Sequence, residues 1–384
     1  MTQLQQPVTR NAEAGGRRRG FVAMRAFRGM DGRRWWLTVL AGVLVVALVA
    51  TAAYLVARPR LADTRAGDPA ILSALGFPAG YNTLAAVLVE RGRRTRYAGI
   101  GADEHHPFET GSNGKTMTGM LLADAAERGE LSLADRLDRW VPEVAGAPVG
   151  EARLESLASH MSGLPRDGAH SQFAFCWVVG TNCMNADEKA LLDDLTAARL
   201  ETPGEGVYSN LGTGALGLAL TRATGMRYAE LAERLTVPLG MSETRVQTPE
   251  TGPLAPRGYQ PWGVRPENWV MDAYQPAGGY VSTASDMGKY LQAILEGTAV
   301  GMDATRQRAE WLDLPPVGDV ASAGVGLFWL TGSLDGRPIL YHTGETGGYR
   351  SAMMIDPQRG RAAMVLSNVN QPVGGLTERV LLTP

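Results

Sequence analysis

The chain has 384 residues, of which 45% are hydrophobic and 20% are charged, and its formal net charge is −2. This length suits one or two domains with a sizeable buried core. The composition excludes an intrinsically disordered chain, a collagen-like repeat and a membrane protein with many spans.

The N-terminal part of the chain predicts a membrane anchor. Residues 1–34 hold eight arginines against Glu13 and Asp31, and residues 35–57 carry no charge over 23 positions. At ~1.5 Å per residue a helix of this length crosses a bilayer. Because arginine accumulates on the cytoplasmic side of a span, we expect a cytoplasmic tail over 1–34, a transmembrane anchor over 35–57 in the cytoplasmic membrane, and an extracytoplasmic remainder.

Two other interpretations of this region are weaker. A cleaved signal peptide usually has an apolar core of only ~7–15 residues, which is shorter than the run found here. A basic arm can bind nucleic acid, but one placed directly before an apolar run is typical of a topology signal. We therefore expect a single-pass membrane protein without a nucleic-acid partner.

The folded part is expected to begin after a short connector over residues 58–75 and to fill residues 76–384. A period-2 apolar pattern at 84–90, a turn, and a second run at 95–101 predict a β-hairpin. Apolar and small residues at helical spacing then predict a helix over 112–129.

Cys176 and Cys183 are the two cysteines of the chain, seven positions apart. In an oxidising compartment they predict a small-loop disulfide. With no third or fourth ligand nearby they do not indicate a zinc site, and we expect neither a metal nor a cofactor.

The region from about 132 to 300 has helical patterns, and the last sixty residues have strand patterns. The expected helices are 186–200, 228–235 and 285–297. The expected strands are 324–331, 338–343, 349–355 and 361–368. Strands at both chain ends with helices between them predict an α+β fold with a mainly antiparallel sheet built from both ends, flanking helices and an inserted all-α lobe. A cleft between lobe and sheet edge is the expected site.

Ser112 and Lys115 form the first chemical motif. Acyl transfer by a serine needs an activated hydroxyl, a proton acceptor and donors for the developing oxyanion. At a spacing of three on a helix, the amine of Lys115 reaches the hydroxyl of Ser112. A helix N-terminus also favours an oxyanion and a deprotonated amine.

Two further motifs follow, Tyr208-Ser-Asn210 and His342-Thr343-Gly344. In this order the three resemble the signature of serine β-lactamases and penicillin-binding proteins. The segments 108–143, 157–165, 278–295 and 342–368 are similar to the class C β-lactamase and D-alanyl-D-alanine carboxypeptidase branch, and the resemblance covers nearly the whole chain after residue 80. It implies the β-lactamase/transpeptidase-like fold.

The resemblance also implies roles for single residues. Ser112 is acylated, and Lys115 and Tyr208 share the proton transfers. Asn210 binds a substrate amide. The backbone N–H groups of Ser112 and Glu345 form the oxyanion hole. His342, Thr343 and Gly344 line the strand edge where the substrate docks.

Two positions depart from the β-lactamase pattern. His342 stands where those enzymes usually have lysine, and Y-S-N with H-T-G is similar to the soluble Streptomyces DD-peptidase and to D-aminopeptidases. A histidine with its ordinary pKa of ~6.5 attracts a substrate carboxylate less than lysine does at pH 7. The carboxylate of Glu345, at a commonly small position, would repel such a substrate and favour one with a free amine if it faces the site.

Other motifs have plainer explanations. Residues 111–116 look like part of a P-loop, but Glu109 stands where that motif needs glycine. Residues 212–217 match G-x-G-x-x-G without a βαβ unit around them, which favours close helix packing. His105 and His106 lack metal-ligand partners. His160 is expected to order the turn that follows its helix.

These observations predict a membrane-anchored extracytoplasmic serine hydrolase that works through an acyl-enzyme. The leading substrate is the D-Ala-D-Ala stem peptide of peptidoglycan. The alternatives are an esterase or D-aminopeptidase, a β-lactamase, and a non-hydrolytic penicillin-binding sensor. A cytoplasmic part of 34 residues is too short for a signalling domain, which disfavours the sensor.

Overall fold

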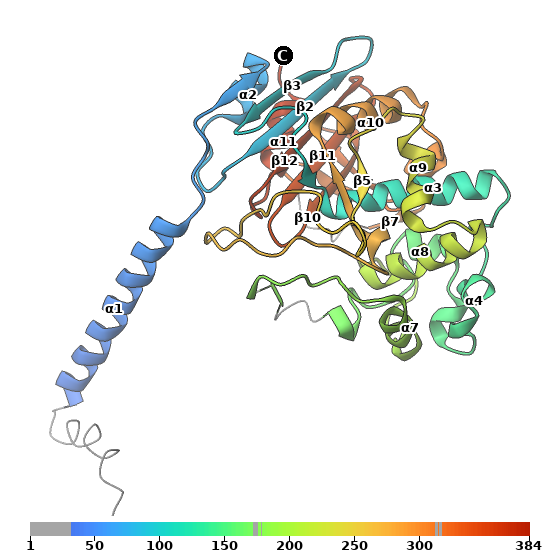
Figure 1. The fold of residues 1–384 in the computed structure, drawn as a ribbon, viewed down its shortest axis with the longest axis horizontal. Helices are drawn as coiled ribbons and strands as arrows, with labels where there is room; N and C mark the ends of the chain where they lie inside the picture. The colour runs from blue at the N-terminus through green and yellow to red at the C-terminus, as the bar shows by residue number, and fades with distance from the viewer. Residues whose placement is uncertain (1–31, 172–175, 178, 312–313, 315–316) are drawn as a thin grey trace, which may run out of the picture. The chain divides into compact units, whose positions relative to one another are not determined.

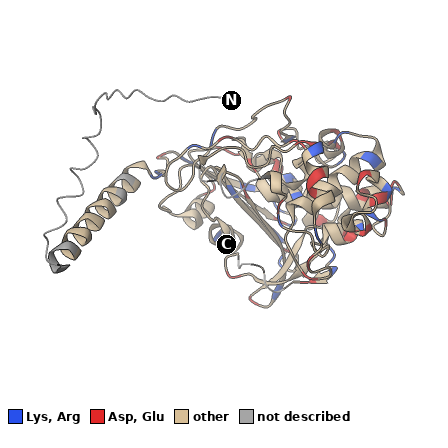
Figure 2. Cartoon of the chain, turned by 90° about the horizontal axis from the view of Figure 1, so that it is seen from below, with Lys and Arg blue, Asp and Glu red and all other residues tan. Residues whose placement is uncertain are grey.

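The apolar segment near the N-terminus forms helix α1 (Gly32–Ala57). The computed structural model describes residues 32–171, 176, 177, 179–311, 314 and 317–384, so most of the arginine-rich tail lies outside the described residues. From Trp36 to Ala57 the helix is long and apolar enough to cross a membrane, and in Figure 2 it carries neither the colour of Lys and Arg nor that of Asp and Glu. A signal sequence meets the same criteria, so the helix indicates secretion or anchoring.

A nine-stranded sheet organises residues 57–384, which cluster as a unit separate from residues 1–56. Its strands are β1 (Arg65–Gly67), β2 (Leu84–Glu90), β3 (Arg96–Ile100), β7 (Ala309–Glu310), β8 (Ala321–Val325), β9 (Leu330–Leu334), β10 (Arg337–Glu345), β11 (Arg350–Asp356) and β12 (Arg361–Ser367). The order is β1-β3-β2-β12-β11-β10-β9-β8-β7, and every pairing is antiparallel. Strand β2 pairs with β12, so both chain ends build the sheet, as the sequence predicts.

Alternating side chains of the strands enter two hydrophobic cores, one on each face of the sheet. In β2, Val87 and Val89 belong to one core and Ala86 and Leu88 to the other. Helices α3 (Gly114–Glu127) and α10 (Ala284–Glu296) cover the first face. Helices α2 (Pro69–Leu75) and α11 (Gly374–Leu381) cover the second, as Figure 1 shows. Because a strand alternates direction at each residue, both faces need this apolar cover.

The middle of the chain is mainly helical. It contains α4 (Leu137–Trp140), α5 (Leu154–Ala158), α7 (Glu188–Ala197), α8 (Asn210–Thr224) and α9 (Tyr228–Thr236), with 3₁₀ turns at Gly111–Asn113 (η1), Pro142–Val144 (η2), Pro148–Glu151 (η3), Ala169–Ser171 (η4), Gln275–Ala277 (η5) and Met302–Thr305 (η6). The expectation of an all-α lobe is wrong in one respect. Strands β5 (Arg245–Val246) and β6 (Tyr280–Ser282) lie within this region and form a small sheet with β4 (Phe108–Glu109).

Three other segments differ from expectation. Residues 65–75, expected as part of a connector, form β1 and α2, because Ile71 and Leu75 are buried against the sheet. Residues 324–331 are not one strand: they hold the end of β8, the start of β9 and a turn in which Phe328 has φ 62°. Helix α11 was not predicted from the sequence.

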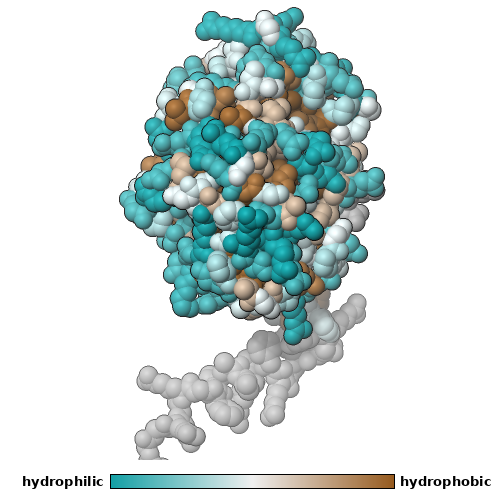
Figure 3. Space-filling model, turned by 90° about the vertical axis from the view of Figure 1, so that its right-hand side faces the viewer, coloured by the Kyte–Doolittle hydropathy of each residue, from teal (hydrophilic) through white to brown (hydrophobic). Residues whose placement is uncertain are grey.

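On the face drawn in Figure 3, hydrophilic residues predominate and apolar ones form scattered patches between them. A few large apolar side chains of the folded part are exposed, among them Phe77 and Val237. Single exposed apolar side chains are common on soluble domains.

Candidate active site

Ser112 lies in the 3₁₀ turn η1, which leads directly into α3, and Lys115 follows on the same face. The Nζ atom of Lys115 is 3.1 Å from Ser112 Oγ and donates to the carbonyl oxygen of Ala277 at 2.6 Å. Burial lowers the pKa of Lys115 well below its usual range, and the charge of Arg166 lowers it further. A neutral amine beside the hydroxyl is the state that can take a proton from it.

Tyr208 stands just before α8, whose N-cap is Ser209. Its ring centroid is 5.0 Å from Lys115 Nζ. Burial raises the pKa of Tyr208 above its ordinary value, although a hydrogen bond with Ser112 acts in the opposite direction. The phenol therefore keeps its proton at neutral pH and can donate it.

Asn210 occupies the first position of α8 and reaches the same hollow as Ser112. Its Nδ2 atom donates to Asp167 Oδ1 at 2.7 Å, and its backbone N–H donates to the carbonyl oxygen of Arg166 at 2.7 Å. These contacts fix the side-chain amide next to the nucleophile.

Strand β10 passes the nucleophile with one edge unpaired at its end. Strand β9 pairs with β10 only as far as Tyr341, whereas β11 pairs with it as far as Glu345. The Thr346 N–H donates to the Tyr349 carbonyl oxygen at 3.1 Å, so Glu345 belongs to a non-hydrogen-bonded pair and its own N–H and C=O point to the other edge. Among the described strands none pairs with that edge beyond Tyr341.

Gly111 lies against this outward-facing peptide group of Glu345. A Cβ at Gly111 would be 2.5 Å from the Glu345 nitrogen and 2.7 Å from its carbonyl oxygen, and Gly111 has φ 53°. Only glycine tolerates both the approach and the backbone conformation. The turn that carries Ser112 is thereby held next to the Glu345 N–H, the arrangement that an oxyanion hole needs.

His342 lies on β10 and lines a pocket that also contains Ser112. Its side chain is buried, and burial together with Lys115 lowers its pKa to about 3. Its Nδ1 donates to the Thr343 carbonyl oxygen at 2.7 Å. A neutral histidine in this position offers no cation for a substrate carboxylate at physiological pH, which agrees with the weaker attraction expected from histidine in place of lysine.

The carboxylate of Glu345 forms an ion pair with Arg350. Its Oε2 lies 2.6 Å from Nη2 of Arg350, the residue directly opposite in β11. Asn370 connects the two, because its Oδ1 accepts from Arg350 Nε at 2.8 Å and its Nδ2 donates to Glu345 Oε1 at 3.4 Å. The carboxylate charge is compensated, which removes the repulsion that the sequence suggested.

His160 is closer to the chemistry than its expected role in a turn. Its ring centroid is 4.6 Å from that of Tyr208, and its Nδ1 accepts the Ser209 N–H at 3.1 Å. The residue is wholly buried with φ 60°, an uncommon conformation for a residue other than glycine. It orders the turn after α5 and also supports the segment that carries Tyr208.

Arg166, Asp167 and Arg350 were not predicted as site residues. A signal for Arg350 existed, since the two C-terminal strands flank a short turn and place it opposite Glu345. Arg166 directly follows the segment 157–165 but carries no motif of its own. Its guanidinium carbon is 4.9 Å from the Tyr208 ring centroid, a contact that only the fold creates.

Two pockets meet at Ser112. The first has a volume of about 30 Å³ and is lined by Ser112, Arg166 and Glu345 together with Gly111, Met184, Asn210, Trp269, Met271, Ala277 and Gly278. The second has a volume of about 560 Å³ and shares Ser112, Arg166 and Glu345 with the first. It adds Tyr208, His342, Thr343 and Arg350 and a wall of apolar side chains that includes Trp311, Leu330, Tyr341 and Val373.

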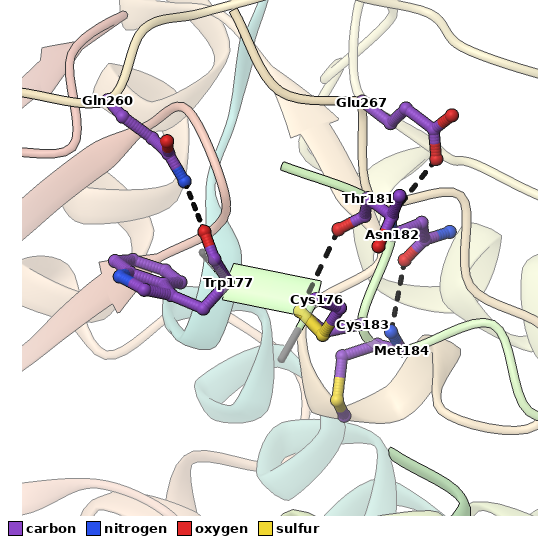
Figure 4. Close-up of a disulfide and its surroundings, with 8 residues drawn as sticks. All are labelled: Cys176, Trp177, Thr181, Asn182, Cys183, Met184, Gln260 and Glu267. Atoms are coloured by element: carbon purple, nitrogen blue, oxygen red, sulfur yellow. Dashed lines mark hydrogen bonds between the residues drawn. A yellow bond between two sulfur atoms is a disulfide. The ribbon is translucent and has the colours of Figure 1, made fainter. Parts of the chain in front are cut away.

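A disulfide joins Cys176 and Cys183 beside the smaller pocket (Figure 4). The loop that it closes is bound to the segment 260–270: Gln260 Nε2 donates to the Trp177 carbonyl oxygen at 2.6 Å, and the Asn182 N–H donates to Glu267 Oε2 at 3.1 Å. Met184, directly after the disulfide, lines the pocket. Phe173 and Phe175, aromatic residues of the same stretch, lie outside the described residues.

Comparison with known proteins places this chain in a family. A family model described as Beta-lactamase matches residues 71–382. The D-alanyl-D-alanine-carboxypeptidase/endopeptidase AmpH of Escherichia coli (strain K12) is 29% identical over 276 residues, which cover 66% of this chain and 68% of that protein.

Two solved structures share the fold. A class C beta lactamase from Rhodobacter sphaeroides superposes with a TM-score of 0.64 at 22% identity, covering 82% of this chain and 99% of that chain. The D-amino acid amidase of Ochrobactrum anthropi SV3 superposes with a TM-score of 0.68 at 22% identity, covering 82% of this chain and 97% of that chain. At such identity these likenesses show the fold alone.

Proposed function

Because this chain belongs to the beta-lactamase family and is a serine hydrolase, we propose that it is a membrane-anchored D-alanyl-D-alanine carboxypeptidase that cleaves peptidoglycan stem peptides through an acyl-enzyme on Ser112. The observation that carries the proposal is the contact of 3.1 Å between Lys115 Nζ and Ser112 Oγ beside the open edge of β10. The name of the Escherichia coli relative supports a peptide substrate.

The chemistry follows from the positions of the side chains. Lys115, neutral in its buried site, takes the proton of Ser112 as Oγ attacks the carbonyl carbon of the substrate. The oxyanion forms next to the N–H groups of Ser112 and Glu345. As the C–N bond breaks, Tyr208 gives its proton to the leaving amine and recovers one from Lys115. Lys115, neutral again after that transfer, then takes a proton from the water that attacks the acyl-enzyme. As the bond between the acyl carbon and Ser112 Oγ breaks, this proton passes to Oγ and the shortened peptide leaves.

The open edge of β10 suits an extended substrate. The N–H and C=O of Glu345 can pair with a peptide segment as an added strand, while Asn210 holds an amide on the other side of the nucleophile. Gly344 lets the strand lie close to the turn of Ser112, because a Cβ there would be 1.9 Å from the Thr110 carbonyl oxygen. Main-chain pairing would position the scissile bond without a charged side chain at 342.

The place of action rests on the apolar helix and the disulfide. Helix α1 is long enough to cross a membrane, and disulfides persist in oxidising compartments. Together they support a catalytic domain on the outer side of the cytoplasmic membrane, with the arginine-rich tail inside.

Incubation of the purified domain with a penicillin, followed by intact-mass measurement over time, tests the proposal. We expect an adduct on Ser112 that persists, release of D-alanine from a D-Ala-D-Ala peptide, and loss of both in Ser112→Ala. Fast loss of the adduct with penicillin turnover would identify a β-lactamase. Ester or D-amino-acid amide hydrolysis without any adduct would identify the esterase or aminopeptidase alternative.

A further inference from the structure

The two pockets at Ser112 are lined by different residues. The proposed proton transfers indicate which pocket holds the leaving group of the substrate and which holds its acyl part. Tyr208 lines only the larger pocket, whereas Asn210 lines only the smaller one. The group that receives the proton of Tyr208 is the leaving group, so the leaving group must lie in the larger pocket. The acyl part then lies in the smaller pocket, next to the amide of Asn210.

The larger pocket is more apolar and more spacious than an alanine leaving group requires. Its volume of about 560 Å³ falls in the ~300–1,000 Å³ range of small-molecule sites. Trp311, Leu330, Tyr341 and Val373 line it. The indole of Trp311 is held flat against Gly206, where a Cβ would lie 2.6 Å from the ring, so this wall is fixed by packing.

The same pocket carries a net positive charge. Its charged lining residues are Arg166, Arg350 and Glu345, and two arginines against one glutamate leave a formal charge of +1 when His342 is neutral. Arg350 is held by Glu345 through Nη2 and by Asn370 through Nε, with the Arg350 side chain 24% exposed. An oriented guanidinium is the group that best recognises a carboxylate.

From this combination we propose that the enzyme releases a large apolar C-terminal residue, of leucine to phenylalanine size, in preference to alanine, and that Arg350 binds its carboxylate. This inference rests on the proposed carboxypeptidase function and names the terminal residue of its substrate. Arg350 then supplies the positive charge that the neutral His342 does not.

A matched peptide series tests the size preference. The peptides share one N-acyl-D-alanyl part and end in D-alanine, D-leucine or D-phenylalanine, and the release of the last residue gives kcat/KM. We expect kcat/KM for D-phenylalanine to exceed that for D-alanine by roughly tenfold or more, the usual discrimination of a hydrophobic pocket. Faster release of D-alanine would overturn the inference and leave the proposed function standing. Failure to cleave any peptide would overturn both.

Gly375 provides a variant that adds bulk at the larger pocket. It lies in the first turn of α11 on the rim of the larger pocket, and a Cβ there meets no atom within 4 Å. We expect Gly375→Phe to bring the ratio of D-phenylalanine to D-alanine release close to one, while Gly375→Ala keeps the wild-type ratio. An unchanged ratio in Gly375→Phe would contradict the assignment of the pocket.

The role of Arg350 is tested with the same peptides carrying a C-terminal carboxamide. The wild type should prefer the free carboxylate, and Arg350→Gln should abolish that preference. Glu345→Gln combined with Arg350→Gln removes both charges, so the preference should be absent there too, whereas Glu345→Gln alone should keep it. A carboxylate preference that survives in the double variant would exclude Arg350 as the anion-binding group.

Discussion

The Nζ atom of Lys115 donates to the carbonyl oxygen of Ala277 at 2.6 Å and lies 3.1 Å from Ser112 Oγ in a wholly buried position. Burial is the largest cause of the lowered pKa of Lys115. Among the described residues, Arg166 lowers this pKa further and Asp167 raises it. Burial therefore decides whether Lys115 can accept the proton of Ser112, and the activity is expected to depend on pH.

We expect kcat/KM to rise with pH as Lys115 loses its proton, and to fall as pH decreases through its lowered pKa. The acid limb arises because only the neutral amine accepts the Ser112 proton. Lys115→Arg should lower kcat/KM by roughly 10²–10⁴-fold at every pH, since a guanidinium stays protonated. A pH profile for Lys115→Arg with the wild-type acid limb and height would contradict this role.

A second prediction concerns the protonation of His342. With a pKa of about 3 the imidazole is neutral from pH 5 to pH 8, with its proton on Nδ1, where it donates to the Thr343 carbonyl oxygen. Nitrogen chemical shifts of the two ring atoms should therefore stay constant over that range. A titration near pH 6.5 would show that the imidazole is solvated and open to substrate.

The lowered pKa of His342 also predicts how stability depends on pH. Between about 3 and the ordinary 6.5, the unfolded chain binds a proton at this residue and the folded chain does not, so stability falls as pH decreases through that window. Relative to His342→Gln, the wild type should lose on the order of 2 kcal/mol of unfolding free energy between pH 6.5 and pH 4.5. Urea unfolding of both proteins at the two pH values measures this difference.

His160 is expected to act as a positioning residue for Tyr208. His160→Phe keeps a ring against Tyr208 but removes the acceptor of the Ser209 N–H, whereas His160→Asn keeps an acceptor and tolerates the positive φ. His160→Phe should lower kcat by roughly 10–100-fold with little change in KM, because the phenol shifts while substrate contacts remain, and His160→Asn should retain more of the wild-type kcat. A change confined to stability, with kcat retained, would leave His160 a structural role only.

Removal of the disulfide should affect the smaller pocket more than the nucleophile. For the loop closed by Cys176 and Cys183, loss of the crosslink costs about 2–3 kcal/mol of unfolding free energy. Because Met184 follows directly and lines the acyl-side pocket, Cys176→Ser with Cys183→Ser should also raise KM. Unfolding in urea and steady-state kinetics separate the two effects, and an unchanged KM would show that the pocket wall does not depend on the crosslink.

The sequence predicted the main features of the fold because its strongest signals are periodic. The β2–β3 hairpin, the helix after Ser112 and the C-terminal strands β10, β11 and β12 all follow from apolar spacing. The prediction of one strand over 324–331 was wrong because a turn at Phe328 interrupts the apolar run. Helix α2 was not predicted because seven residues are too few to show a helical pattern. The burial of Ile71 and Leu75 against the sheet, which stabilises α2, exists only after folding.

For the candidate site, motifs predicted residues that the structure brings close together, but they did not predict the electrostatic states of those residues. The three-residue spacing of Ser112 and Lys115 implies contact, which the structure has. The protonation state of His342 could not be predicted from the residue type, because burial and the nearby Lys115 decide its pKa. The pairing of Glu345 with Arg350 needed the register of β10 on β11, and Arg166 reaches Tyr208 only through the loop between α5 and η4.

The short unpaired edge at the end of β10 also affects how readily this protein aggregates at high concentration. Exposed strand edges recruit other chains and seed aggregation. Here β9 occupies the edge up to Tyr341 and the turn of Gly111 stands against Glu345, so the open stretch accommodates a few residues at most. The proposed capture of peptides by strand addition is thus compatible with protection from self-association, because the open stretch has room for a short peptide but not for a full-length strand.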